Sequence, residues 1–412
     1  MLSVDEALAQ ILEAVPAFPV SSVRLSDAYG LVLAESVTSD VDSPPFDKAL
    51  MDGYAVRSAD VAGEQAMLSV IEEVMAGQVP VKTVAAGEVT RIMTGAPMPD
   101  GADAVVPVEQ TQLDADGDSV VISASAVKVG DHLMKRGAAL KQGEHVLSAG
   151  TRLRPQELGA LAEFGQAEVP LRRKPHVAVL ATGDELVSIE TRPGPGQIRN
   201  SNATMLAAQI ERAGGEAHVL EIARDNRDDL GRKIRAGLEY DILLLSGGVS
   251  AGKADLVPSE LEAAGVRQLF HKVNVKPGKP IWFGVAESAD PSGANTEKTE
   301  CFVFGLPGNP VSSMVCFELF TRTAIRKLMG DPEPGVQTTS ARLAQTHESK
   351  GNRPTYHPSC LVAEAAELRV TPVPWSGSAD LRATVEANST IIFPAGRRRF
   401  EAGEVVNVVD WA

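Results

Sequence analysis

Apolar positions recur at helical spacing at the start of the chain, and the pattern then changes to short strand-like runs. The first helix is predicted from Val4 to Val15, behind a capping box formed by Ser3 and Glu6. Helical periodicity returns at 154–164. The runs between these helices predict strands at 22–25, 31–37, 54–56, 67–74, 88–93, 104–109 and 119–122. We therefore expect an elongated N-terminal unit that is interrupted by a small β domain.

From residue 172 onwards, buried strands alternate with amphipathic helices. Apolar runs predict strands at 176–181, 217–222, 242–245, 267–275, 281–285 and 301–305. Helices are predicted between them, the first capped by Asn202 and the last opened by Asn309 and Pro310. Alternation of this kind predicts a doubly wound, mostly parallel sheet whose ligands bind beyond the carboxyl ends of the strands.

The last part of the chain follows a proline-rich linker at 331–335 and is rich in strands, without a convincing helix. A small barrel or sandwich is expected there. The fold class is therefore an α/β multidomain chain with a central doubly wound, mostly parallel sheet. The expected parts are an elongated N-terminal unit (1–40 and 137–171), an inserted β domain (41–136), an α/β domain (172–330) and a C-terminal β-barrel domain (336–412).

The amino-acid composition argues against several classes of binding partner. The net charge of −15 argues against nucleic acid or an anionic membrane, and an aromatic content of 4% makes a base-stacking surface improbable. Three cysteines without a CxxC pair suit a reducing compartment, and neither a signal peptide nor a membrane span is recognised, so a cytoplasmic protein is expected. The seven histidines show no HExxH or other metal-binding spacing. Candidate chemistry therefore lies with the acids and lysines.

A glycine-rich loop follows the most apolar strand. The strand at 242–245 ends in Ser246-Gly247-Gly248, with Ser250 and Asp255 before the next helix. Strand, glycine turn and helix is the geometry that presents backbone N–H groups to a phosphate. Taken alone, such a loop is as often merely a turn.

Polar clusters at neighbouring strand ends make a binding site the better interpretation. Each cluster follows a predicted strand of the α/β domain, and together they comprise Asp184 and Glu185, Arg224 and Asp225, the glycine loop with Asp255, and Lys272 with the segment Lys276-Pro277-Gly278-Lys279-Pro280. Grouped carboxylates beside a phosphate-sized loop suit Mg²⁺, and the lysines suit a multiply charged anion. The residues predict metal-assisted chemistry on a phosphorylated or oxyanionic small molecule.

Motifs along nearly the whole chain resemble the molybdopterin molybdenumtransferase family, to which bacterial MoeA and the E domain of gephyrin belong. The matching segments are Pro44-Pro45-Phe46-Asp47, Met51-Asp52-Gly53-Tyr54-Ala55-Val56, Arg91-Ile92-Met93-Thr94-Gly95-Ala96-Pro97, Ala181-Thr182-Gly183-Asp184-Glu185-Leu186, the 196–202 segment GQIRNSN, the glycine loop with Asp255, the 276–280 segment KPGKP and Gly305-Leu306-Pro307-Gly308-Asn309-Pro310. The resemblance implies a molybdopterin-binding type of α/β domain.

The activity implied by this resemblance is the insertion of molybdate into adenylylated molybdopterin, with release of AMP and dependence on Mg²⁺, in molybdenum cofactor biosynthesis. A homodimer is implied, and the molybdopterin adenylyltransferase and downstream cofactor-handling proteins are expected partners. Asp184, Glu185, Asp225 and Asp255 would act at the scissile pyrophosphate, the last three as Mg²⁺ ligands. The implied substrate-binding residues are Ser246, Gly247, Gly248, Ser250, Lys272, Lys276, Lys279, Pro307, Pro310, Arg353 and Ser378.

Asp52 and Thr94 would come from the inserted β domain to serve catalysis. Without the resemblance, both would be interpreted as ordinary turn residues. Two departures from the family pattern are Ala138-Ala139, where an acidic pair is common, and Ala49, where serine is common.

Two other functions remain open from the sequence. A molybdopterin adenylyltransferase would share the α/β domain, but its GGTG-type loop is absent and this chain carries three additional regions. An interaction scaffold would not need to retain the set of acids and lysines.

Overall fold

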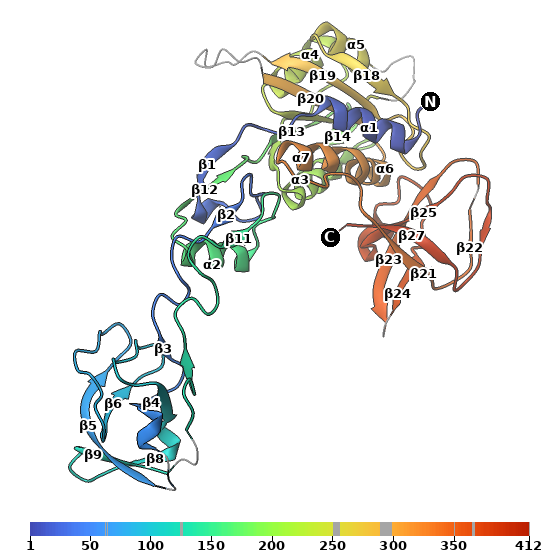
Figure 1. The fold of residues 1–412 in the computed structure, drawn as a ribbon. Coiled ribbons are helices and arrows are strands. Elements are labelled where there is room, and N and C mark those ends of the chain that lie inside the picture. Colours follow the sequence, from blue (N-terminus) through green and yellow to red (C-terminus); the bar gives the residue numbers. More distant parts are fainter. Residues whose placement is uncertain are drawn as a thin grey trace. The chain divides into compact units, whose positions relative to one another are not determined.

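The computed structural model describes residues 1–61, 63, 65–123, 127–249, 256–288, 299–349, 351–364 and 367–411 (Figure 1). Its contacts group the chain into two compact units. The larger unit comprises residues 1–34, 150–154 and 168–412, and the smaller comprises 35–149 and 155–167. None of the helices in the described part of the chain combines the length and apolar character needed to cross a membrane.

The larger unit is built on a six-stranded sheet. The strands in spatial order are β16 (Glu216–Val219), β13 (His176–Ala181), β17 (Ile242–Ser246), β20 (Thr299–Leu306), β19 (Trp282–Ser288) and β18 (Arg267–His271). The first four pair in parallel, whereas β19 is antiparallel to both of its neighbours. The mostly parallel sheet expected from the sequence is thereby confirmed, with β19 as its single reversed strand.

Helices cover both faces of this sheet (Figure 1). One layer contains α4 (Arg227–Gly237) and α5 (Val257–Ala263), and the other contains α3 (Ser201–Ala213), α6 (Pro310–Cys316), α7 (Arg322–Leu328) and α1 (Val4–Ala14). The strands are apolar on both sides because alternate residues face opposite layers. Ala178 and Leu180 of β13, for example, join the core beneath α4, in which Leu230 and Ile234 are fully buried. The expected doubly wound domain is therefore present.

The start of α3 differs from the sequence-based expectation. Asn200, not Asn202, is the N-cap, and its side chain accepts a hydrogen bond from the N–H of Ala203. Two asparagines spaced two residues apart are both acceptable caps by residue type, and the pairing of β14 (Leu186–Val187) with β15 (Ile198–Arg199) places Asn200 at the helix start. The side chain of Asn202 is therefore not needed to cap α3 and can form other hydrogen bonds.

A buried carboxylate fastens α3 to the helix that follows the last parallel strand. Between α6 and α7 the chain forms a π-helical segment, Phe317–Thr321. Glu318 in this segment is 2% exposed and accepts hydrogen bonds from Gln209 and Arg212, while Arg322 Nη1 lies 3.0 Å from its second oxygen. Burial raises the pKa of Glu318 against the opposing effect of these arginines.

The C-terminal region forms a closed five-stranded barrel, as expected. Its strands are β21 (Thr338–Leu343), β24 (Glu367–Pro372), β23 (Thr355–Glu364), β25 (Ser389–Phe393) and β27 (Val405–Asp410). A short ribbon of β22 (His347–Glu348) and β26 (Arg399–Phe400) extends from it. The barrel interior is apolar, with Phe393, Ile391 and Val408 fully buried.

The smaller unit contains a second six-stranded sheet. Its order is β7 (Ala104–Pro107), β4 (Gly53–Val56), β6 (Glu88–Ile92), β5 (Ala66–Val74), β9 (Ser119–Ile122) and β8 (Thr111–Leu113). The five inserted strands expected from the sequence are present, and β8 was not anticipated. The smaller unit also contains the pairs β2 (Val37–Thr38) with β11 (His145–Leu147) and β3 (Lys48–Ala49) with β10 (Leu133–Met134), and helix α2 (Pro155–Glu163).

One strand prediction near the N-terminus was wrong. Residues 31–37 do not form a continuous strand; Val32 and Leu33 make single bridges to different partners, and only Val37 belongs to a strand, β2. The apolar residues of this segment are buried because they fill the core, which requires no ladder of hydrogen bonds. The preceding strand, β1 (Ser21–Arg24), is present and pairs with β12 (Glu168–Leu171).

Candidate active site

A cavity of about 860 Å³ opens beyond the carboxyl ends of the parallel strands in the larger unit. We call it the main cavity. It is formed by the ends of β13, β17 and β20, the start of α3 and a loop of the C-terminal region. Its lining includes Thr182, Gly183, Glu185, Asn202, Asp225, Ser246, Gly247, Gly248, Pro307, Asn309, Pro310 and Leu381. The position is the one that open α/β sheets use to bind ligands.

The glycine loop forms one wall of this cavity because side chains would not fit. Gly247 and Gly248 have φ angles of 102° and 66°, which residues with a Cβ rarely adopt. A Cβ on Gly247 would lie 2.8 Å from the carbonyl oxygen of Thr182, and one on Gly248 would lie 2.5 Å from Val257. The cavity is therefore lined here by bare backbone, which a phosphate can approach closely. Ser250 and Asp255, predicted on the same loop, lie outside the described residues.

Two of the predicted acids are joined by a pair of reciprocal hydrogen bonds. The backbone N–H of Asp184 donates to the Asp225 carboxylate at 3.3 Å, and the backbone N–H of Asp225 donates to the Asp184 carboxylate at 3.2 Å. Arg224 reinforces the junction by donating to the carbonyl of Asp184. Asp225 and Glu185 line the main cavity, whereas Asp184 is not among its lining residues. Two exposed carboxylates, those of Glu185 and Asp225, thus line the same cavity as the glycine loop.

Asn202 connects three segments around the same cavity. Its side-chain N–H groups donate to Ser246 Oγ and to the carbonyl oxygen of Gly308, both at 2.9 Å. Ser246 ends β17, and Gly308 belongs to the loop that precedes α6. Sequence reasoning mistook Asn202 for a helix cap. The sequence did contain a signal for this role: Asn200 can cap the helix equally well, which leaves the side chain of Asn202 free to bond elsewhere.

A second, smaller cavity of about 430 Å³ collects most of the predicted anion ligands. We call it the lysine cavity. Lys276, Lys279, Arg353 and Ser378 all line it, together with Pro277, Gly278, Pro280, Pro307, Asn309, Ser312, Trp375, Ser376 and Gly377. None of these described lining residues is acidic, so three positive charges meet without a carboxylate among them. Lys272 lines neither this cavity nor the main one.

Hydrogen bonds between the α/β domain and the C-terminal region hold the lysine cavity together. Asn309 donates through its side chain to Ser378 Oγ at 2.9 Å, and Arg353 Nη1 donates to the carbonyl of Val275 at 3.0 Å. The backbone of Lys276 forms a parallel bridge with Thr355 at the start of β23. Each side of the cavity is therefore anchored to a different domain of the same unit.

The two cavities are neighbours. Pro280, Pro307 and Asn309 contribute to the lining of both. A ligand that carries phosphate groups at one end and binds an oxyanion at the other could therefore occupy the two cavities together.

Asp52 and Thr94 lie side by side in the smaller unit, on loops that flank β4 and β6. Asp52 Oδ1 accepts hydrogen bonds from the hydroxyl of Thr94 at 2.6 Å and from its backbone N–H at 2.7 Å. The Thr94 hydroxyl, followed by the backbone N–H, lowers the pKa of Asp52. Its carboxylate is consequently held ionised in acid conditions that would protonate an ordinary aspartate.

Replacing Thr94 by valine is expected to raise the pKa of Asp52 toward the ordinary range, because the stronger of its two donors is lost. A folded-state pKa below the unfolded value stabilises the fold above the unfolded pKa, and that stabilisation is lost as the pH falls through the folded pKa. The Asp52 titration followed by carboxyl-carbon NMR measures the change. Thr111→Val is the matched control, since that hydroxyl donates to a backbone carbonyl. An unshifted midpoint in Thr94→Val would refute the assignment of the donor.

Three family models match the chain in order along its length. They are the MoeA N-terminal region (domain I and II) at residues 2–165, the probable molybdopterin binding domain at 178–327 and the MoeA C-terminal region (domain IV) at 340–411. A molybdopterin molybdenumtransferase from Bacillus subtilis (strain 168) is 34% identical over 414 residues, which cover 99% of this chain and 94% of that protein. The chain belongs to the molybdopterin molybdenumtransferase family. It is therefore an enzyme, a transferase.

Other relatives agree with this assignment. A molybdopterin molybdenumtransferase from Staphylococcus aureus (strain COL) is 33% identical over 423 residues, covering 99% of this chain and 95% of that protein. The crystal structure of a molybdopterin biosynthesis MoeA protein from Pyrococcus horikosii has a TM-score of 0.78 at 30% identity, over 100% of this chain and 99% of that chain. A molybdenum cofactor biosynthesis protein from Pyrococcus furiosus, at 20% identity and a TM-score of 0.58, shows the fold alone. The family predicted from the motifs is confirmed.

Proposed function

We propose that this enzyme inserts molybdate into adenylylated molybdopterin and releases AMP, in an Mg²⁺-dependent reaction. The observation that carries the proposal is the pairing of the two cavities. The main cavity combines a bare glycine backbone with carboxylates, and the adjoining lysine cavity combines three cations with hydroxyl groups. This pairing suits a substrate that has a pyrophosphate to be cleaved next to the point where an oxyanion is received.

The donor set of the main cavity fits Mg²⁺. Glu185 and Asp225 offer hard carboxylate oxygens at the cavity wall, although among the described residues these acids do not by themselves bring three ligands together. Mg²⁺ commonly uses one or two protein carboxylates, with waters and substrate phosphate oxygens completing the octahedron. When bound, the ion would neutralise charge on the phosphates. Asp255 stays a proposed third ligand.

The lysine cavity is the proposed binding site of molybdate. Molybdate is a tetrahedral dianion, and an ammonium about 4 Å from a unit negative charge gains roughly 4 kcal/mol at an effective dielectric of 20, before desolvation. Lys279 is exposed and Lys276 is half-buried, so the first can guide the anion in while the second meets it deeper. Ser378 is already an acceptor for Asn309, and its own hydroxyl proton can be donated to an oxyanion.

The remaining expectations are part of the same proposal. We propose that the enzyme is a cytoplasmic homodimer, that Asp52 with Thr94 contributes to turnover, and that a molybdopterin adenylyltransferase supplies its substrate. The four-part domain division is likewise kept as a proposal. Full-length similarity to proteins named molybdopterin molybdenumtransferase supports the activity over the adenylyltransferase and scaffold alternatives.

The direct test is to incubate the purified protein with adenylylated molybdopterin, Mg²⁺ and molybdate and to measure AMP. We expect AMP and molybdenum-loaded cofactor in equal amounts. Reactions without molybdate or without Mg²⁺ should fall to background. AMP formation that ignored both ions would contradict the proposed reaction.

Replacing Asn202 by alanine is expected to raise the KM for adenylylated molybdopterin roughly tenfold, with a smaller effect on kcat. Two hydrogen bonds of about 1 kcal/mol each position the cavity wall, and a 1.4 kcal/mol loss is a factor of ten. Steady-state AMP release measures the change. Gln197→Ala, in the preceding loop, is the control: its side chain accepts from the backbone of Gly194 and lies outside the cavity lining. Equal KM values for the two variants would contradict the role assigned to Asn202.

A further inference from the structure

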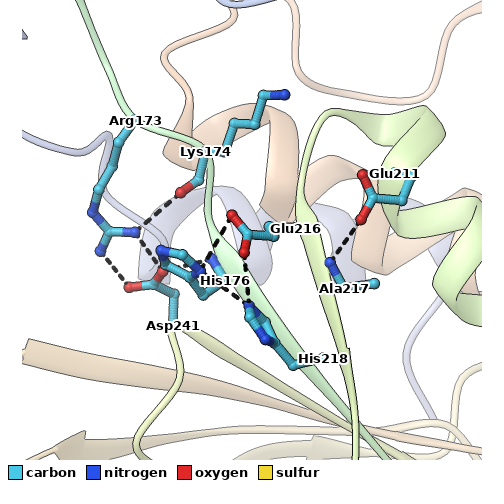
Figure 2. Close-up of polar contacts among 8 residues, drawn as sticks. All are labelled: Arg173, Lys174, His176, Glu211, Glu216, Ala217, His218 and Asp241. Atoms are coloured by element: carbon cyan, nitrogen blue, oxygen red, sulfur yellow. Dashed lines mark hydrogen bonds and ion pairs between the residues drawn. The ribbon is translucent and has the colours of Figure 1, made fainter. Parts of the chain in front are cut away.

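Two histidines and a glutamate converge at the edge of the central sheet, away from both cavities. His176 Nδ1 lies 3.1 Å from His218 Nε2, and the two oxygens of Glu216 lie 3.7 Å and 3.4 Å from these nitrogens. Figure 2 shows the three side chains pointing toward one another. In the part of the chain that the structure describes, this is the one group of three such side chains with ligand atoms within 4.8 Å of each other.

The register of the sheet creates this convergence. In the parallel pairing of β13 with β16, His176 is aligned with Glu216, and Ala178 with His218. Side chains alternate between the two faces with a period of two, so His176 shares its face with Ala178 and therefore with both residues of β16. Three polar side chains are thereby fixed on a single face by backbone pairing alone.

The distances match a metal polyhedron. Zn²⁺ binds histidine nitrogens and carboxylate oxygens at about 2.0–2.2 Å with tetrahedral geometry, which places neighbouring ligand atoms about 3.3–3.6 Å apart. Of the three separations between ligand atoms, 3.4 Å lies within that range, 3.1 Å lies just below it and 3.7 Å just above it. In the metal-free protein the two imidazoles can share one proton between the facing nitrogens; a metal ion would take its place.

The backbone at the ligand positions is held by surrounding contacts. The N–H of His176 donates a hydrogen bond to the Asp241 carboxylate at 2.8 Å. The guanidinium of Arg173 donates two hydrogen bonds of 2.6 Å to the same carboxylate (Figure 2). On the other strand, the N–H of Ala217 donates to Glu211 at 3.0 Å. Because these hydrogen bonds restrain the backbone of both strands, metal binding should cost little conformational entropy of the backbone at the ligand positions.

We propose that His176, Glu216 and His218 form a binding site for a divalent transition-metal ion, with Zn²⁺ as the expected occupant and water as the remaining ligand. Imidazole nitrogens select Zn²⁺, Co²⁺ or Ni²⁺ over Mg²⁺ and Ca²⁺, which prefer oxygen ligands. The site is separate from the proposed Mg²⁺ position, since His176 and Glu216 begin their strands and the main cavity lies beyond the opposite ends.

The ion would link two strands that are distant in sequence. β16 is the outermost strand of the sheet and has a neighbour on one side only. A metal that binds the folded form alone stabilises it in proportion to the logarithm of its concentration. The bound ion would therefore hold the edge strand β16 against its neighbour β13, and it should raise the stability of the fold.

The test uses the tag-free full chain with excess Mg²⁺ present, so that hard-ligand sites are filled. Titration with Zn²⁺ by calorimetry is expected to give one site per chain, and Co²⁺ should produce a visible absorption band of a low-symmetry nitrogen- and oxygen-ligated ion. His218→Ala and Glu216→Gln should each weaken Zn²⁺ binding at least tenfold, and Zn²⁺ should raise the unfolding temperature of the parent protein more than that of either variant.

Matched controls separate this site from other exposed groups. His145→Ala removes an exposed histidine of the smaller unit, and Glu221→Gln removes an exposed carboxylate near the end of the same strand; both should bind Zn²⁺ as the parent does. Glu216→Gln keeps the size of the side chain, so it remains informative if His218→Ala folds poorly. No zinc binding by the parent, or undiminished binding by Glu216→Gln and His218→Ala, would overturn the proposal.

Discussion

Replacing Asp225 by asparagine is expected to reduce AMP release by roughly 10²- to 10³-fold, the loss typical when one group that stabilises charge at a reacting centre is removed. Asparagine keeps the shape and can still accept from the N–H of Asp184, so the loop should persist. The negative charge that would hold Mg²⁺ is nevertheless lost. Glu185→Gln should behave similarly, because Glu185 also borders the main cavity.

The control for this experiment is Asp228→Asn, an exposed acid in the first turn of α4 that does not line the main cavity. It should retain nearly normal turnover. All three variants should show the thermal unfolding of the parent, which establishes that any loss is chemical. Should Asp225→Asn release AMP at the parent rate, Asp225 has no part in the reaction and the placement of the pyrophosphate in the main cavity is wrong.

The second large effect is expected in the lysine cavity. Lys279→Gln should raise the molybdate concentration needed for half-maximal rate by at least tenfold, while the KM for adenylylated molybdopterin changes less. Lys279 is an exposed cation that lines the lysine cavity and not the main one. Arg353→Lys should act in the same direction, since lysine keeps the charge but loses the planar group that bonds to Val275.

Sulfate provides an independent measurement because it is also a tetrahedral dianion. It should inhibit the parent competitively with molybdate and inhibit Lys279→Gln more weakly. Lys174→Gln, which removes an exposed lysine outside the cavity, is the control. If molybdate saturation and sulfate inhibition are both unchanged in Lys279→Gln, the anion binds elsewhere.

Much of the fold could be predicted because strand ends and helix starts carry local signals. Apolar runs located the parallel strands, and proline after asparagine located the start of α6. The direction of β19 could not be predicted from local residues, because the direction of a strand depends on the path that its connections take relative to the sheet. The misplaced cap of α3 shows a related limit, because Asn200 and Asn202 are equivalent by residue type and only their neighbours in space distinguish them.

In the candidate site, too, the residues next to strand ends could be predicted from the sequence, whereas those brought together by distant contacts could not. Acids at strand ends were expected to meet, because parallel strands end at one edge, and Asp184 does meet Asp225 there. Arg353 and Ser378 came from the family resemblance, since nothing local predicts that a barrel loop reaches the KPGKP segment. The proposed zinc site was not predicted from the sequence, because no metal-binding spacing joins its histidines. His176 and His218 lie on different strands, and only the register of the sheet brings them together.

The pairing of β1 with β12 has a consequence for the order of folding. The hydroxyl of Ser22 in β1 donates a hydrogen bond to Glu168 in β12, 146 positions later, and the whole of the smaller unit is encoded between these two residues. Closing so long a loop is entropically costly unless the intervening chain is already compact. During synthesis the smaller unit can complete its sheet first, which shortens the effective distance between β1 and β12. We therefore expect a mutation that destabilises the β-sheet of the smaller unit to delay assembly of the larger unit, which contains both cavities.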